Sequence, residues 1–182
     1  MKKILLTLIT LVFAGGLFAE NNFVEYYPNG KKKTEGNYNS AVTINDNDSK
    51  DVKASKLANA IKIGKWSYWY ENGQLAAEQY YTNTGAMTGN WKGWYQSGTL
   101  ELDINFTTGD ATFYHPNGKM ESTGKMLDGM IKDGKWIVYH DNGNKNVEGS
   151  YNKGQKDGLW IYYDRDGKNS ATENWKNGTL VK

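Results

Sequence analysis

Two histidines are the residues of this chain best suited to acid–base or metal chemistry. His115 and His140 occur in the related motifs Tyr-His-Pro-Asn-Gly and Tyr-His-Asp-Asn-Gly, so they hold equivalent positions in a repeat. If each motif forms one β-hairpin, equivalent residues lie two strands apart, roughly 10 Å at the usual ~4.8 Å strand spacing. One metal ion cannot bind both, because a Zn–N bond is only about 2.0–2.1 Å long. We therefore interpret the two histidines as repeat-surface residues rather than as a metal or catalytic site.

Acidic residues also recur in step with the repeat. Four of them lie five residues after a repeated glycine: Glu35, Glu78, Asp103 and Glu148. This recurrence favours cross-strand pairing with lysines; the alternative is a glycosidase pair, whose carboxylates are about 5–9.5 Å apart. The chain has no cysteine and no GxSxG, HExxH or P-loop motif, which excludes thiol catalysis and leaves no recognised nucleophile. We predict that the protein is not an enzyme and has no cofactor.

The element that must position these side chains is clearest between Gly134 and Gly158. Two runs of aromatic and β-branched residues flank Asn142-Gly143, which is a strong signal for a β-hairpin with a two-residue type I′ turn. The same pattern occurs six times along the chain. Its turn glycines are Gly30, Gly73, Gly98, Gly118, Gly143 and Gly167.

Three further columns of the repeat are apolar. Seven residues before each turn glycine stand Phe23, Trp66, Trp91, Ala111, Trp136 and Trp160. Four residues before it stand Tyr26, Trp69, Trp94, Tyr114, Tyr139 and Tyr163. Eight residues after it stand Tyr38, Tyr81, Phe106, Met126, Tyr151 and Trp175. A period of this length indicates a repeat architecture, and consecutive hairpins form a meander.

We predict a mainly β fold, an elongated single-layer antiparallel meander of about six hairpin repeats and twelve short strands. One ladder of rings should form the core, and the other face should keep partly exposed Tyr and Trp residues. The fourth copy is degenerate, with Ala111 in place of Trp and Met126 in place of Tyr. The run Lys176-Asn177-Gly178 is interpreted as the start of a seventh turn.

The chain divides into four parts. Residues 1–19 combine a basic start, an apolar stretch and a small-residue end at Ala19, as in a secretory signal peptide. Residues 20–39 form the first repeat, residues 40–63 an insertion, and residues 64–182 five further repeats. Within the insertion we predict a short helix over 54–63, with Leu57 and Ile61 on one stripe.

The net charge of the chain argues against nucleic acid and anionic lipid as partners. The formal net charge of the full chain is +2, and Lys2 and Lys3 in the signal segment account for all of it. The mature chain is therefore formally neutral, with both signs interspersed, and has no electrostatic footprint for nucleic acid or anionic lipid. We expect no nucleic-acid partner and no membrane binding after signal removal.

The motif GxWxxYxxNG, a Glu-Gly-x-Tyr strand and a Gly-Lys-x-Asp-Gly loop together resemble the MORN-repeat variant of bacterial proteins. Many members of that family carry the label YwqK-type antitoxin. The resemblance covers residues 22–182 apart from the insertion. It implies an elongated β array used for binding or scaffolding, without a catalytic centre.

The feature that points to function is the density of rings, since Tyr and Trp dominate binding hot spots. We predict an exported protein, located in the periplasm, at the cell surface or outside the cell, that binds a protein partner. Alternatives are an antitoxin or immunity-type neutraliser of a toxin and a carbohydrate-binding surface module. The candidate partner-binding surface comprises Trp69, Tyr70, Trp94, Tyr95, His115, Tyr139, His140 and Tyr163.

Overall fold

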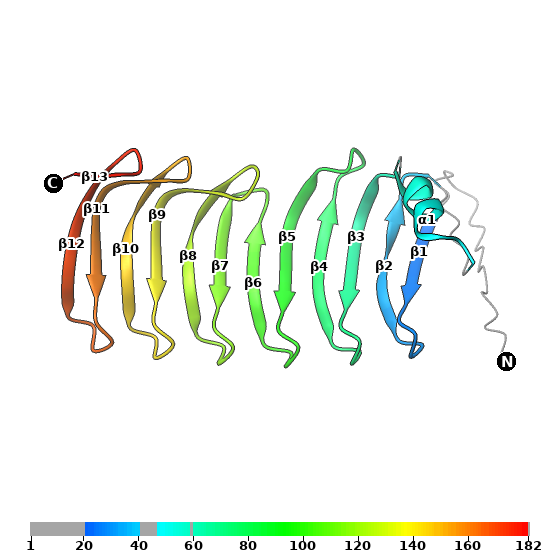
Figure 1. Ribbon diagram of the computed structural model, residues 1–182, viewed down its shortest axis with the longest axis horizontal. Coiled ribbons are helices and arrows are strands. Elements are labelled where there is room, and N and C mark those ends of the chain that lie inside the picture. The colour runs from blue at the N-terminus through cyan, green and yellow to red at the C-terminus, as the bar shows by residue number, and fades with distance from the viewer. Residues whose placement is uncertain (1–20, 41–46, 59, 182) are drawn as a thin grey trace.

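A computed structural model describes residues 21–40, 47–58 and 60–181. They form one open sheet of 13 strands that neighbour one another in sequence order, each antiparallel to the next (Figure 1). The elements are β1 (Asn21–Tyr26), β2 (Lys32–Tyr38), α1 (Lys50–Leu57), β3 (Lys62–Trp69), β4 (Leu75–Tyr81), β5 (Met87–Trp94), β6 (Leu100–Asn105), β7 (Asp110–Tyr114), β8 (Met120–Leu127), β9 (Ile131–Tyr139), β10 (Lys145–Asn152), β11 (Gln155–Tyr163), β12 (Asn169–Lys176) and β13 (Thr179–Val181).

The predicted fold class is confirmed: the protein is an elongated antiparallel meander in one layer (Figure 1). The predicted signal segment, residues 1–19, lies outside the described residues. Among the residues that are described, no helix is long and apolar enough to cross a membrane.

The six hairpin turns lie together at the lower edge of the sheet in Figure 1. The prediction of a type I′ turn at Asn142-Gly143 is wrong, because Gly143 has a φ of 96° but Asn142 is not at positive φ. The amide of Gly143 donates to the carbonyl of His140 (2.9 Å), and strand pairing resumes at Tyr139 and Lys145. This geometry is a type I turn followed by a glycine bulge. The side chain of Asn142 stabilises it by accepting from the amide of Asn144 (3.0 Å).

Tight two-residue turns occur instead at the upper edge. Lys153 and Gly154 have φ values of 46° and 85°, and Asn177 and Gly178 have 48° and 76°, as type I′ turns require at both central positions. The run at Asn177 therefore does not begin another hairpin of the lower edge. It closes the turn into β13, and the sheet has thirteen strands rather than the predicted twelve.

The inserted helix begins four residues and ends six residues earlier than predicted. Ser49 caps α1 by accepting from the amide of Val52, and the helix ends at Leu57. Ile61, expected on the helical stripe, instead donates its amide to Asn39 Oδ1 and accepts from the amide of Asn39. Pairing with the end of β2 thus overrides the helical pattern in this segment.

The core lies on one side of the sheet, which we call the core face. Trp66, Trp136 and Trp160 are only 1–3% exposed, although the residues that the structure describes form no second layer over the sheet. Each indole lies against a glycine of the preceding hairpin: an added Cβ at Gly36 would be 2.2 Å from Trp66, and one at Gly149 would be 2.3 Å from Trp160. The glycine of the Glu-Gly-x-Tyr motif is therefore needed because the neighbouring ring occupies its side-chain space.

The degenerate fourth repeat keeps this packing by exchanging the sizes of the two partners. Ala111 replaces the tryptophan, and Ile104 takes the position of the glycine that it faces. Both are buried, at 1% and 2% exposure. The β6–β7 pairing runs without the irregularity found where β2, β4, β8 and β10 pair with the following hairpin. The smaller side chain thus changes the local course of the sheet.

Candidate interaction surface

The opposite side of the sheet, which we call the outer face, carries the recurring carboxylates. Glu78 lies 2.5 Å from Lys65, and Asp103 lies 3.2 Å from Lys92, in each case across a strand pair. Glu148 lies 3.0 Å from Lys135 and 3.1 Å from Lys145. The prediction of cross-strand pairing with lysine is confirmed for Glu78, for Asp103 and, through Lys135, for Glu148. It is wrong for Glu35, whose lysine partner Lys32 lies on the same strand, β2.

Glu148 is the most strongly perturbed of these groups. Tyr163 donates its hydroxyl to Glu148 Oε1 at 2.6 Å, and two lysine ammonium groups lie beside the carboxylate. The hydrogen bond from Tyr163, followed by those from Lys135 and Lys145, lowers the pKa of Glu148 to about 2. The same bond raises the pKa of the Tyr163 hydroxyl, because it stabilises the neutral phenol. Glu148 thus links the last two repeats.

A row of rings runs along the outer face, beside the hairpin turns. The ring of each hairpin pairs in register with the residue two positions after the turn glycine: Trp69 with Leu75, Trp94 with Leu100 and Tyr114 with Met120. In the first and fifth hairpins the latter position holds a lysine, and in the sixth it holds Asn169. Lys32 Nζ lies 5.6 Å from the centroid of Trp69, and Lys145 Nζ lies 5.9 Å from that of Tyr163. The central part of the row is therefore apolar, and a lysine lies on either side of it.

We call this central row the aromatic stripe; it comprises Trp69, Leu75, Trp94, Leu100, Tyr114, Met120 and Tyr139. None of the seven is fully buried. Of the predicted surface residues, Trp69, Trp94 and Tyr139 belong to the stripe, and Tyr163 lies just beyond it. The predicted surface left out Tyr114, although it stands in the same repeat column as Trp69 and Trp94. It also left out the aliphatic members, although their constant place two residues after the turn glycine was a usable signal.

The other half of the predicted surface has a different role. Tyr70 and Tyr95 donate their hydroxyls to the backbone carbonyls of Trp94 (2.8 Å) and Tyr114 (2.7 Å) in the next repeat. His115 Nε2 contacts the carbonyl of Tyr139 at 3.1 Å.

His140 Nε2 makes the same contact with the carbonyl of Tyr163, also at 3.1 Å. Each member of this column therefore connects its repeat to the next one, so the column is a set of inter-repeat hydrogen bonds. The two histidines bind different carbonyls and do not form a shared site. Among the described residues, no group of three or more His, Cys, Asp or Glu side chains could hold a metal ion.

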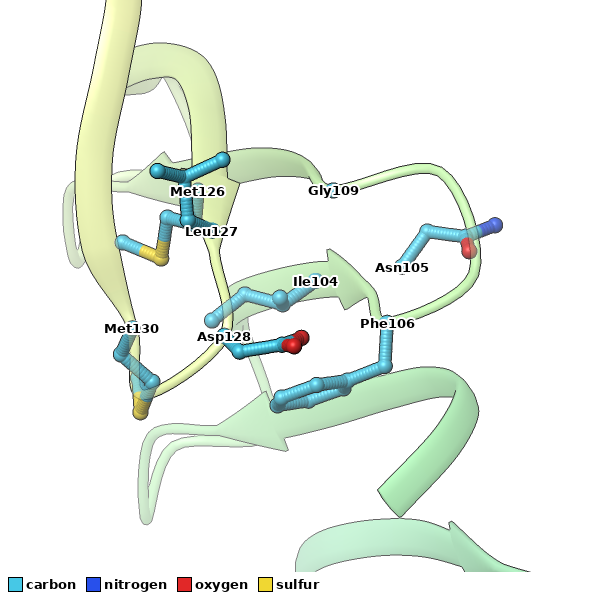
Figure 2. Close-up of a pocket in the computed structure, with 8 residues that line it drawn as sticks. All are labelled: Ile104, Asn105, Phe106, Gly109, Met126, Leu127, Asp128 and Met130. Atoms are coloured by element: carbon cyan, nitrogen blue, oxygen red, sulfur yellow. The ribbon is translucent and has the colours of Figure 1, made fainter. Parts of the chain in front are cut away.

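The junction between the third and fourth repeats is hollowed on both faces. On the outer face a polar hollow of about 240 Å³ lies beside the aromatic stripe; it is lined by Asn90, Asp103, Asn105, Asp110, Thr112 and Tyr114. On the core face a smaller hollow of about 20 Å³ is lined by the residues shown in Figure 2. Both lie where Ala111 replaces the tryptophan of the repeat.

The fold defines a class of protein: a linear array of β-hairpin repeats with one packed face and one open face. The family model described as MORN repeat variant matches four segments, residues 19–40, 62–83, 107–127 and 132–153. These four segments of the chain are thus similar to MORN repeats. The hairpins β5–β6 and β11–β12 lie outside the matched residues but have the same turn register. A search among curated proteins found no match.

Proposed function

We propose that this is an exported, non-enzymatic repeat protein that binds a protein partner through the aromatic stripe. The observation that supports this is the unbroken row of incompletely buried rings and aliphatic side chains on a face that no other element of the described residues covers. Trp and Tyr contribute most strongly at the centre of protein interfaces, where large apolar area is combined with a polar handle. Export is inferred from the signal-type segment at residues 1–19.

The dimensions of the stripe suit an elongated partner surface. From β3 to β9 there are six strand spacings, which is roughly 30 Å at ~4.8 Å each. The rows of paired Lys and Glu beside the stripe, such as Lys65 with Glu78, form a polar rim. An apolar centre with a polar rim is the usual anatomy of a protein interface.

Affinity capture tests the proposal. The mature chain is immobilised and exposed to envelope and extracellular extracts of the source cell. The same is done with the double variant Trp94→Ser/Leu100→Ser, which interrupts the stripe at its centre. Leu159→Ser is the matched control, because Leu159 is a 52% exposed outer-face residue away from the stripe. We expect a partner retained by the parent and by the control but lost by the double variant. Equal capture by all three would refute a role for the stripe, and identification of the partner as a toxin would favour the antitoxin alternative.

The polar hollow beside Tyr114 favours carbohydrate binding as a second candidate function. Amide, carboxylate and hydroxyl groups next to an aromatic ring are the groups that hydrogen-bond and stack on a sugar. Electrophoresis of the mature chain through gels containing cell-wall or host glycans would show retardation, and Asn90→Ala should reduce it. Retardation that is unchanged in Asn90→Ala but lost in the stripe variant would place any glycan on the stripe instead.

A further inference from the structure

The aromatic stripe has the same period as the hairpins. One ring stands on each odd-numbered strand from β3 to β9, in the order Trp69, Trp94, Tyr114 and Tyr139. Successive rings are therefore two strand spacings apart, which is about 9.4–9.8 Å at the usual ~4.7–4.9 Å per strand. On the even-numbered strands between them stand Leu75, Leu100 and Met120. The surface thus offers one aliphatic gap between two rings in each hairpin.

The polar atoms of these rings are open to a ligand. The core-face indoles differ: the N–H of Trp66, for example, donates to a backbone carbonyl of the preceding hairpin at 3.0 Å. Within the described residues, the indole N–H groups of Trp69 and Trp94 make no hydrogen bond, and they are not buried. The same holds for the hydroxyls of Tyr114 and Tyr139. Because an indole N–H can only donate, the stripe presents a row of donors to solvent.

A polyproline II helix matches the spacing of the rings. It rises about 3.1 Å per residue with three residues per turn, so every third residue returns to the same face after about 9.3 Å. Over the three gaps of the stripe the mismatch is only about 0.3–1.5 Å. A heptad of an α-helix rises about 10.5 Å, which gives a mismatch of roughly 2–3 Å over the same distance. An extended strand covers one gap in about three residues, but its third residue points to the opposite face. Of these three conformations, polyproline II alone stays in step with the rings.

The chemistry of a proline-rich segment also complements the stripe. Polyproline II has no internal hydrogen bonds, so its carbonyls remain available as acceptors, and proline has no N–H. The partial positive charges of the ring donors would thus meet a backbone that carries only acceptors. Pyrrolidine rings are apolar and suit the gaps at Leu75, Leu100 and Met120. A glycan suits these gaps less well, because hydroxyl groups placed over aliphatic side chains are left without hydrogen-bond partners.

We propose that the aromatic stripe binds a proline-rich segment of a protein partner in the polyproline II conformation. The segment lies across the strands, and every third residue enters one gap between two rings. About ten residues, roughly 31 Å in this conformation, span the stripe from Trp69 to Tyr139. A segment of this kind is already ordered before binding, so it loses little conformational entropy. The inference rests on the proposed function, because it names the class of partner for the same surface.

Titration of the ¹⁵N-labelled mature chain with oligoproline peptides tests the match. Peptides of three, six, nine, twelve and fifteen prolines are compared with a flexible Gly-Ser peptide of twelve residues. We expect the indole N–H signals of Trp69 and Trp94 to shift and that of Trp66, which is already hydrogen-bonded, to stay. Affinity should rise by about threefold to tenfold for each added triplet, as one further ring contact supplies. It should level off at about twelve residues, where the peptide is as long as the stripe.

Two variants locate the peptide. Trp94→Phe keeps a ring but removes the N–H donor, and it should weaken binding of the twelve-proline peptide by about threefold to tenfold. Leu159→Ser, at an exposed position away from the stripe, should leave the affinity unchanged. The remaining amide signals of each variant show whether the sheet is folded. Equal binding of the Gly-Ser peptide, or binding that Trp94→Phe does not weaken, would overturn the proposal.

The titration also separates this proposal from its competitors. If the Trp69 and Trp94 signals did not respond to any oligoproline, or responded instead to a linear oligosaccharide such as cellohexaose, the proline-rich partner would be ruled out. The proposed function would still stand if affinity capture lost its partner in the stripe variant. Equal capture by that variant and by the parent chain would refute the proposed function itself.

Discussion

Adding one methyl group at Gly149 tests the packing that holds successive repeats together. An alanine Cβ at this position would lie 2.3 Å from Cδ2, 2.4 Å from Cε2 and 2.6 Å from Cγ of Trp160. Ordinary contacts between such atoms are about 3.5–4.0 Å, so the ring would have to move by about 1 Å. Trp160 is only 3% exposed and cannot move freely. We expect Gly149→Ala to destabilise the β10–β11 junction by about 1–3 kcal/mol, the usual cost of overpacking a core.

A second glycine of the same junction is the control. Gly158 has a φ of +78° and nothing within 4 Å of an added Cβ. Gly158→Ala should cost about 1–2 kcal/mol through backbone strain alone. In a Trp160→Ala background the clash at Gly149 disappears, whereas the strain at Gly158 remains. Only Gly149 should therefore couple to Trp160, by about 1–3 kcal/mol in a double-mutant cycle.

Native-state amide hydrogen exchange of β10 and β11 is the assay, because stability in a repeat array is local and a single unfolding midpoint does not describe it. Circular dichroism of each variant checks that the sheet persists. If Gly149→Ala left exchange unchanged, or if its cost were the same with and without the Trp160 ring, the glycine would not be needed for the indole and the packing argument would fail.

Three further predictions concern other parts of the array. Ala111→Trp should lower the thermal midpoint by circular dichroism, through a clash with Ile104 worth about 1–3 kcal/mol, and Ile104→Gly should restore part of the loss; no rescue would contradict the size exchange. The pKa of Glu148 is lowered to about 2 in the fold, so its stabilisation is complete above its usual value near 4.5 and is lost as the pH falls toward 2. The free energy that protects β10 against hydrogen exchange should therefore fall by about 1–3 kcal/mol over that pH range, allowing for solvent screening. Glu148→Gln should remove this pH dependence. Gly143→Val places a β-branched residue at a φ of 96° and should open the fifth hairpin to limited proteolysis near its turn; unchanged protection would refute the strain.

The repeat columns predicted the strands well because they record two physical requirements at once. A turn glycine marks where the chain reverses, and a ring seven residues earlier marks the buried side of the strand. The turn type was not predictable from Asn142-Gly143 alone. Glycine has positive φ both in a type I′ turn and in a type I turn followed by a glycine bulge. Asparagine tolerates positive as well as negative φ, so the strand register determines which of the two turns forms. Similarly, Ile61 fits a helical stripe, but its pairing with Asn39 is a contact between distant residues that periodicity cannot reveal.

The candidate surface was predicted only in part for the same reason. Alternation correctly placed Trp69 on the face opposite Trp66. The roles of Tyr70 and His115 depended on the carbonyl of the adjacent repeat, which lies within reach only once the hairpins are stacked. A sequence column of polar rings is equally consistent with a free surface and with a row of inter-repeat hydrogen bonds.

The degenerate fourth repeat gives one junction of the linear array a surface that the other junctions do not have. In a perfect array every junction would offer the same surface, so a partner would have no reason to bind at one place. At the β6–β7 junction the Ile104–Ala111 exchange keeps the core filled, and the two strands pair without the register shift found at four other junctions between hairpins. Both hollows then open at this one junction, one on each face. Restoring a tryptophan at 111 and a glycine at 104 should therefore leave the fold intact while filling the hollows at this junction, whereas the same exchange of sizes at Gly149 and Trp160 should create a second junction without the register shift.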